Sequence, residues 1–221
     1  MSTQVDHSHA LSDGAFRGGG AERRYSRPVR DAEIRSALHA RLVDQHGAGP
    51  STRYVDELGL CGVVRVDVAV INGTLSGYEL KSDRDTLRRL PTQVEYYSKV
   101  LDHATVVVGE LHYTHQQLHS LIPDWWGLMV ATERDGQVVL EEHRASKVND
   151  GIDAGSLSQL LWKAEVLAEL AALGLDDGVR SKPRRVLYQR LVDSVPLDEL
   201  RAIVRRRLKA REAWRQPRPR A

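Results

Sequence analysis

Three residues with chemically useful side chains lie on either side of an Asn-Gly dipeptide. Asp67 precedes the dipeptide, and Glu79 and Lys81 follow it. Two carboxylates held a few ångströms apart repel each other unless a cation joins them, and carboxylate oxygens suit a hard divalent ion such as Mg2+. A lysine beside such an ion can orient an attacking water or neutralise charge that develops on a phosphate. The three residues therefore indicate metal-assisted phosphate chemistry, provided that the fold brings them together.

The segments that carry these residues are expected to be two antiparallel strands. Val63–Ile71 and Leu75–Ser82 both alternate apolar with polar or small residues, which is typical of half-buried strands. The first segment places four valines on one face, and we expect that face to pack on the core. The opposite face would gather Asp67, Glu79 and Lys81.

The length of the connection decides whether Asp67 and Glu79 share a face. A two-residue Asn-Gly turn would send Glu79 to the valine face, where burying its unpaired charge costs several kcal/mol or more. A three-residue loop over residues 71–73, with Gly73 left-handed in a bulge, instead pairs Asp67 with Gly77 and leaves it diagonal to Glu79. We therefore predict an odd-length loop, and we expect Gly77 to leave room for a substrate.

Spacing alone favours a salt-bridge cluster on an exposed sheet face, but similarity to a known family changes this balance. The stretch 65–83, which contains Arg-Val-Asp-Val-Ala-Val and Gly-Tyr-Glu-Leu-Lys-Ser-Asp, resembles the core of the PD-(D/E)XK nuclease superfamily. In that superfamily an Asp on one strand and a Glu-x-Lys on the next form the metal site. Gln93 and Tyr97 resemble the Gln-x-x-x-Tyr motif of RecB-like members, and their spacing places both on one helix face. This similarity covers about residues 30–110.

Over a longer stretch, about residues 28–215, the chain resembles a small bacterial family of PD-(D/E)XK proteins. There the nuclease core is followed by a helical tail with Leu-Leu-Trp, here residues 160–162, and a terminal Arg-x-x-Trp, here Arg211 and Trp214. The resemblance implies an α/β fold of the restriction-endonuclease type. That fold has a mixed central sheet flanked by helices, here with an α-helical C-terminal extension.

The resemblance also implies a role for each motif residue. Lys81 would position or activate water, while Gln93 and Tyr97 would support the site or a phosphate. The cofactor would be Mg2+ or Mn2+. Its ligands would be oxygen donors from the two strands: Asp67, Glu79 and the backbone carbonyl of Leu80.

Superfamily members usually add a further acid from the first helix or strand, and two positions compete for this role. Glu33 lies at the start of the first predicted helix, where an acid also interacts favourably with the helix dipole. Glu57 lies just before the hairpin. The resemblance favours Glu33 as the further metal ligand, with Glu57 as the alternative.

Basic residues offer candidate contacts for nucleic acid, with DNA as the first expectation. Those near the predicted site are Arg65, Arg84, Arg88 and Arg89. Residues 201–221 hold nine Lys or Arg against one acid, and the candidates there are Arg205, Arg206 and Arg207. A solvated helix face with a basic tail would explain this charge equally well.

The composition, 41% hydrophobic and 28% charged over 221 residues, is typical of a soluble globular protein. No apolar run approaches the roughly 18 residues that cross a bilayer, and no signal-peptide pattern opens the chain, so we expect no membrane partner. Cys61 is the only cysteine, which excludes an internal disulfide and a zinc site of several thiolates. We expect a cytoplasmic protein.

The pattern divides the chain into a disordered leader (1–27), a nuclease-like α/β domain (28–150), a helical extension (151–215) and a basic tail (216–221). Strand 104–109 should be buried and parallel to its neighbour, across a helical crossover. The first expected helix starts after Pro28, with Asp31 as its cap, and is ended by residues 47–50. The other expected helices cover 91–101 and 115–121, then 156–173, 183–194 and 197–212. The other expected strands cover 54–58, 63–71, 75–82, 126–132 and 137–142.

These features together predict metal-dependent phosphodiester hydrolysis in nucleic acid. Two alternatives stay open. One is a non-catalytic module that keeps the fold and binds nucleic acid, and that would tolerate loss of Glu79 or Lys81. The other is a regulatory or defence accessory protein whose helical tail engages another protein. A homodimer is compatible with each of these interpretations.

Overall fold

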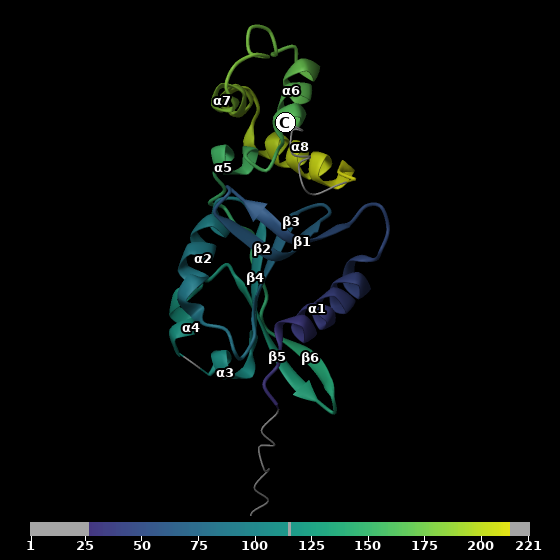
Figure 1. Cartoon of the computed structure of the whole chain (residues 1–221), viewed down its shortest axis with the longest axis vertical. Helices are drawn as coiled ribbons and strands as arrows, with labels where there is room; N and C mark the ends of the chain where they lie inside the picture. The colour runs from purple at the N-terminus through teal and green to yellow at the C-terminus, as the bar shows by residue number, and fades with distance from the viewer. Residues whose placement is uncertain (1–26, 115, 213–221) are drawn as a thin grey trace, which may run out of the picture.

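The computed structural model describes residues 27–114 and 116–212. The predicted leader except Arg27, and the predicted basic tail together with Trp214, lie outside the described residues. The described part is a six-stranded mixed sheet with helices on both faces and further C-terminal helices at one end (Figure 1). The predicted fold class is confirmed.

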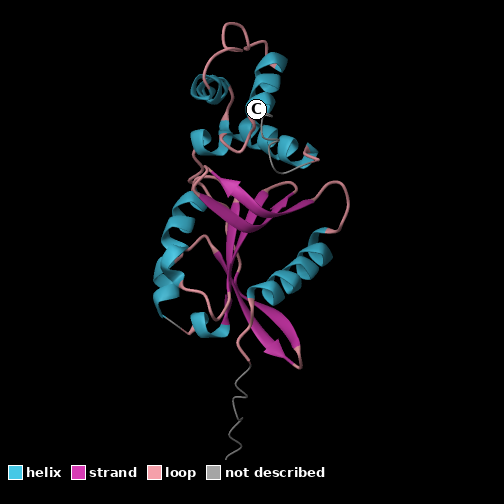
Figure 2. Cartoon of the chain, viewed as in Figure 1, coloured by secondary structure: helices cyan, strands magenta, loops and turns pink. Residues whose placement is uncertain are grey.

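Each strand of the sheet lies beside its sequence neighbours, in the order β1-β2-β3-β4-β5-β6. The first three strands form an antiparallel meander, β3 to β5 are parallel, and β6 returns antiparallel to β5. Parallel neighbours need crossover connections, and helices supply them here (Figure 2). The bounds are β1 Arg53–Leu60, β2 Val64–Ile71, β3 Leu75–Lys81, β4 His103–Gly109, β5 Gly127–Arg134 and β6 Gln137–Arg144.

Two helices cover the two faces of the sheet. α1 (Asp31–His46) packs through Ile34, Leu38 and Leu42 on one face and ends at Gly47, whose positive φ of 73° suits glycine. α2 (Leu90–Ser98) packs through Leu90 and Tyr97 on the other face. The remaining helices are η1 Leu87–Arg89, α3 Glu110–Tyr113, α4 Gln116–Leu121, α5 Ala154–Ser158, α6 Lys163–Ala172, α7 Arg184–Ser194 and α8 Leu197–Ala210.

The helix predicted over 156–173 is in fact two helices, α5 and α6. Each has its own N-terminal cap: the carboxylate of Asp153 accepts from the backbone N–H of Ser156, and that of Glu165 accepts from the backbone N–H of Trp162. Between them Leu160 and Leu161 are buried. The apolar run within residues 156–173 therefore includes the connection between α5 and α6. A buried connection and the buried face of a helix both carry apolar residues, so the sequence pattern does not distinguish them.

The connection between β2 and β3 has three residues, Asn72 to Thr74, and the pairs Ile71–Leu75 and Ala69–Gly77 flank it. The side chain of Asn72 closes the turn by accepting from the backbone N–H of Thr74 at 3.0 Å. The predicted odd length is confirmed. The predicted loop over residues 71–73 and its left-handed Gly73 are wrong, since Gly73 has no positive φ. Continued along the strands, this register places Asp67 opposite Glu79 rather than Gly77.

The valines of β2 do not share one face. Val66 packs with the α2 side of the sheet, whereas Val68 and Val70 pack with the α1 side. The alternation changes at Asp67, and Glu57, on the neighbouring strand β1, has a positive φ of 56°. The prediction of a continuous valine face is therefore wrong. At Asp67 and Glu57 the side chains of the two strands change the face of the sheet on which they lie.

The C-terminal helices share a hydrophobic core with the sheet. Leu157, Leu161 and Val166 belong to the same buried cluster as Val55 and Leu58 of β1. Polar contacts also join the two parts: the carboxylate of Asp102 lies 3.4 Å from the guanidinium groups of Arg201 and Arg205. The boundary predicted near residue 150 therefore lies in a connection between two parts of the chain whose apolar side chains pack against each other.

Across the described ranges 27–114 and 116–212, no helix combines the length and apolarity that crossing a bilayer requires.

Candidate active site

Strands β2 and β3 and helix α2 bring the predicted motif residues together around Glu79. One carboxylate oxygen of Glu79 accepts from the ammonium of Lys81 and from Nε2 of Gln93, the latter at 2.5 Å. The other oxygen accepts from the hydroxyl of Tyr97 at 2.5 Å. Gln93 and Tyr97 lie one helical turn apart on α2, so the same helix face supplies both contacts.

Asp67 lies at the point where β2 separates from β3. Its Oδ2 accepts from the backbone N–H of Leu80 at 2.8 Å, so a side chain takes the place of a strand-to-strand backbone bond. Its Oδ1 lies 3.7 Å from the guanidinium of Arg35 on α1. Burial raises the pKa of Asp67 to about 7, and the negative charge of Glu79 adds to the shift.

The site is most open to solvent at the Asp67 end. The exposed fraction is 1% for Glu79, 7% for Lys81 and 4% for Gln93, whereas 20% of the Asp67 side chain is exposed. The buried ring of Trp126 stacks on that of Tyr97, with centroids 5.4 Å apart, so the surroundings of Tyr97 are closed to solvent. A ligand would therefore approach past Asp67, while the expected accessibility of Glu79 and Lys81 is not seen.

Gly77 does not provide space for a substrate. A Cβ at this position would lie 2.4 Å from Cδ1 of Leu101 and 3.0 Å from Cγ1 of Val66. The expectation of an open approach over Gly77 is wrong, because core side chains fill that space.

The two candidates for the further acid lie in different surroundings. Glu33 forms an ion pair with Arg27 and accepts from the backbone N–H of Arg30, contacts that hold it at the N-terminus of α1. Those contacts lower its pKa to about 2. Glu57 lies 3.6 Å from Arg35, the same guanidinium that contacts Asp67. The structure thus links Glu57, rather than the favoured Glu33, to the site.

The basic residues near the site are exposed. Arg65 pairs with Glu57 at 3.1 Å and keeps 69% of its side chain in solvent. Arg84, Arg88 and Arg89 are exposed in the loop and short helix that follow β3. These four residues remain candidate phosphate contacts.

The C-terminal arginines, in contrast, have structural partners. Arg206 and Arg207 both pair with Glu169, whose side chain is 6% exposed. Arg205 pairs with Asp102. An acid buried in this way needs its cations, since an unpaired buried charge is costly. The charge of α8 is therefore largely used within the molecule, which supports the structural interpretation of this segment.

Arg35 is a site residue that the sequence analysis missed. Its guanidinium donates to the backbone carbonyl of Asp67 at 2.6 Å and lies within 3.7 Å of the carboxylates of Asp67, Asp56 and Glu57. No motif marks this position. The available signal was an arginine within the first helix, beside the apolar stripe that contains Ile34 and Leu38.

The donor set suits a hard divalent cation. The described residues contain no group of three or more His, Cys, Asp or Glu side chains placed to hold a metal. The candidate ligands are two carboxylates, Asp67 and Glu79, with the carbonyl of Leu80. Burial, with the charge of Glu79, raises the pKa of Asp67 despite Lys81 and Arg35, and a bound cation would favour the ionised carboxylate. Carboxylate and carbonyl oxygens are the donors that fit Mg2+ or Mn2+.

The fold and the buried acid–lysine cluster define an α/β protein whose candidate site lies between two strands and a crossover helix. Residues 26–216 match the family model described as Bacteriophage P4 protein cII, so the chain belongs to that family. Comparison with curated proteins gave no match. Among solved structures, the chain resembles the SPO1766 protein of unknown function from Silicibacter pomeroyi. The two are 20% identical with a TM-score of 0.42, over 66% of this chain and 90% of that one.

Proposed function

We propose that this protein hydrolyses phosphodiester bonds in nucleic acid, with DNA as the first substrate to test and Mg2+ or Mn2+ as cofactor. The observation that carries the proposal is the convergence of Asp67, Glu79 and Lys81 from adjacent strands, with the side chains of α2 holding Glu79 in place. This arrangement agrees with the resemblance to PD-(D/E)XK nucleases.

Each side chain has a defined task in this proposal. Asp67, Glu79 and the carbonyl of Leu80 would hold the metal, which supplies Lewis acidity and lowers the pKa of a bound water. Lys81 would orient water or balance charge on the phosphate. Gln93 and Tyr97 act through Glu79 and are therefore positioning residues.

One observation favours a second candidate, a non-catalytic nucleic-acid-binding protein on the same fold. Glu79 is 1% exposed and both of its oxygens are hydrogen-bonded, so its present partners already satisfy it without a metal. In that case the cluster would serve the fold and the exposed arginines would do the binding.

Cleavage assays with a matched lysine control separate the two candidates. Supercoiled plasmid, linear duplex and single-stranded DNA are incubated with Mg2+ or Mn2+ and with wild type, Lys81→Ala or Lys99→Ala. Lys99 lies directly after α2, pairs with Glu95 and keeps 38% of its side chain in solvent. We expect Lys81→Ala to lose about a hundredfold or more of the cleavage rate, as is usual for a group that stabilises transition-state charge, and Lys99→Ala to retain it.

Two results would contradict the proposal. Equal cleavage by wild type and Lys81→Ala would mean that a contaminant or another site does the chemistry. Binding of DNA by wild type with no metal-dependent cleavage of any of the three substrates would favour the non-catalytic candidate.

A further inference from the structure

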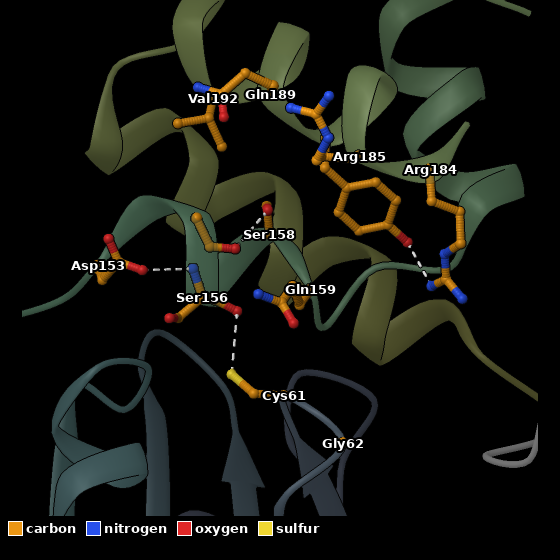
Figure 3. Close-up of a pocket in the computed structure, with 12 residues that line it drawn as sticks. Cys61, Gly62, Asp153, Ser156, Ser158, Gln159, Arg184, Arg185, Gln189 and Val192 are labelled. Carbon is orange, nitrogen blue, oxygen red and sulfur yellow. Dashed lines mark hydrogen bonds between the residues drawn. The ribbon is translucent and has the colours of Figure 1, made fainter. Parts of the chain in front are cut away.

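A groove lies between the edge of the sheet and the C-terminal helices. Its larger part, about 610 Å3, lies between Cys61 and Gly62 of the β1–β2 turn and side chains of α5 and α7 (Figure 3). Its smaller part, about 240 Å3, lies between β1 and the connection that carries Trp162. Gln159 and Arg184 line both parts, so the two parts are adjacent.

The groove has two arginines without carboxylate partners. Arg184 donates to the hydroxyl of Tyr188 at 2.8 Å, and Arg185, the next residue of α7, lines the larger part. Neither is within ion-pair distance of an acid among the described residues, whereas Arg206 and Arg207 are both paired with Glu169. Two positive charges without a carboxylate partner in the described part of the chain therefore line the groove at the start of α7.

An arginine lies against each of the two aromatic rings that line the groove. The guanidinium of Arg184 lies 5.3 Å from the ring centroid of Tyr188, and that of Arg211 lies 4.3 Å from that of Trp162. With an arginine against each ring, these rings offer bases less stacking surface than the aromatic platforms of proteins that bind single strands. Arginine forks, by contrast, match phosphate geometry. The arginines at the start of α7 are therefore suited to phosphates and not to particular bases, while Asp153, Asp56 and Glu57 line other parts of the groove.

The groove also leads to the candidate active site. Glu57 lines its smaller part, and Glu57 shares Arg35 with Asp67. The open end of the site is the Asp67 end. A single strand of nucleic acid that lies in the groove would thus pass from the two arginines of α7 towards the side from which a ligand reaches Asp67.

We propose that this groove binds the phosphodiester backbone of single-stranded nucleic acid, with Arg184 and Arg185 contacting successive phosphates. The volume lies within the range of small-molecule sites, which holds a few nucleotides of one strand. The path towards Asp67 rests on the proposed nuclease function, whereas the binding itself does not.

Binding is measured without metal, so that it does not depend on cleavage. Fluorescence anisotropy follows a labelled oligothymidine in EDTA, from about 50 to 200 mM salt. The test variant is Arg184→Ala/Arg185→Ala. The control variant, Arg134→Ala/Lys147→Ala, removes two exposed charges outside the groove. Circular dichroism verifies that both variants fold.

We expect the groove variant to bind about tenfold more weakly. The slope of log Kd against log salt should fall by about 1.4, which is about 0.7 for each phosphate of a single strand that the variant no longer binds. The control variant should keep the affinity and slope of wild type. Thymidine monophosphate should compete only weakly, because a single phosphate meets one arginine at a time. Duplex DNA should bind more weakly than the single strand.

Each failure has a distinct meaning. Three results would contradict binding in the groove: an equal loss of oligothymidine affinity in both variants, tighter binding of the mononucleotide than of the oligothymidine, or unchanged affinity in the groove variant. Loss of cleavage in Lys81→Ala together with unchanged oligothymidine binding in the groove variant would overturn the groove and leave the nuclease. Loss of binding in the groove variant with no cleavage by wild type would support the groove and overturn the nuclease.

Discussion

Two properties of Asp67 conflict unless a cation is bound: a hydrogen bond fixes its carboxylate in a largely buried place, and ionisation is unfavourable there. Its Oδ2 accepts from the backbone N–H of Leu80, and this hydrogen bond fixes the carboxylate beside β3. At that place it is largely buried and faces the charge of Glu79, so its pKa rises to about 7. The folded protein therefore holds a proton on Asp67 at a pH where the unfolded chain has already released it.

The linkage has a defined sign. Below about pH 4 Asp67 is protonated in both states and contributes nothing. Between about pH 4 and pH 7 the folded state alone holds the proton, so stability falls as pH rises, and the full penalty is present above pH 7. Replacement of Asp67 by Asn keeps an oxygen that can accept from Leu80 and removes the charge.

We expect Asp67→Asn to be more stable than wild type at pH 8 in EDTA, by a few kcal/mol, since one pKa unit corresponds to about 1.4 kcal/mol. The gain should disappear near pH 4. Urea denaturation at the two pH values measures it. Asp124→Asn, which alters a fully exposed carboxylate, is the control and should change stability little at either pH. A gain that is equal at both pH values would show that charge is not its cause.

A bound cation should reverse this penalty. A metal that binds only the folded state stabilises it by about 2.7 kcal/mol at a concentration of about 100 times Kd. We therefore expect Mn2+ or Mg2+ to raise the Tm of wild type at pH 8 by several degrees, and EDTA to return it. Asp67→Asn and Glu79→Gln should lose the shift, while Asp124→Asn keeps it. Equal shifts in all four proteins would place the metal elsewhere.

At the scale of elements, the strand and helix types followed from periodicity, but the details around the site did not. Alternation and the Asn-Gly dipeptide predicted the hairpin, and the cost of burying Glu79 on the valine face predicted its odd loop. The start of the loop depended on Asn72, whose side chain closes the turn. The change of face at Asp67 depended on a side chain that replaces a backbone bond. Neither effect has a periodic signature.

Gly109, at the end of β4, shows a similar long-range constraint. A Cβ there would lie 2.2 Å from Oδ1 of Asp83 and 2.9 Å from the backbone nitrogen of the same residue. Asp83 cannot move freely, because its carboxylate accepts from the backbone N–H groups of Val29 and Leu111. This glycine therefore allows the loop after β3 to pack on β4, a role that the sequence did not reveal.

We expect Gly109→Ala to lower the free energy of unfolding by about 3 kcal/mol, at the upper end of the usual range for overpacking. Gly73→Ala is the matched control: a Cβ at Gly73 meets nothing within 4 Å, and its φ is not positive. It should change stability by less than about 0.5 kcal/mol. Chemical denaturation of both variants measures the difference. Similar losses in the two would mean that glycine entropy, not the contact with Asp83, decides the effect.

At the scale of the whole molecule, the predicted fold class, a mixed sheet flanked by helices with further C-terminal helices, is confirmed, but the sequence did not indicate how the sheet and these helices are joined. The tail was defined by its helical periodicity and its positive charge. The structure uses much of that charge inside the molecule, where Glu165 and Glu169 pair with Arg211, Arg206 and Arg207. Formal charge along a sequence cannot distinguish such pairs from a free basic surface, because the partners lie about 40 positions away.

The shared core predicts that the two parts fold as one unit. Leu157, Leu161 and Val166 pack in one cluster with Val55 and Leu58 of β1, and Asp102 holds two arginines of α8. Ending the chain after residue 150 would expose the apolar side of this cluster and leave Asp102 without its cations. Both changes destabilise the sheet, by about 25 cal/mol for each Å2 of apolar surface uncovered and by the cost of an unpaired, largely buried charge.

We expect full-length protein to unfold in a single transition, with circular dichroism and tryptophan fluorescence giving the same Tm. The fragment 1–150 should show no cooperative transition, and addition of the fragment 151–221 should restore it in part. Leu161→Ala, at a fully buried position, should lower the single Tm for both probes together and cost about 2–5 kcal/mol. A fragment 1–150 that melts sharply alone, or a Leu161→Ala variant in which the two probes separate, would show instead that the helices form an independent domain.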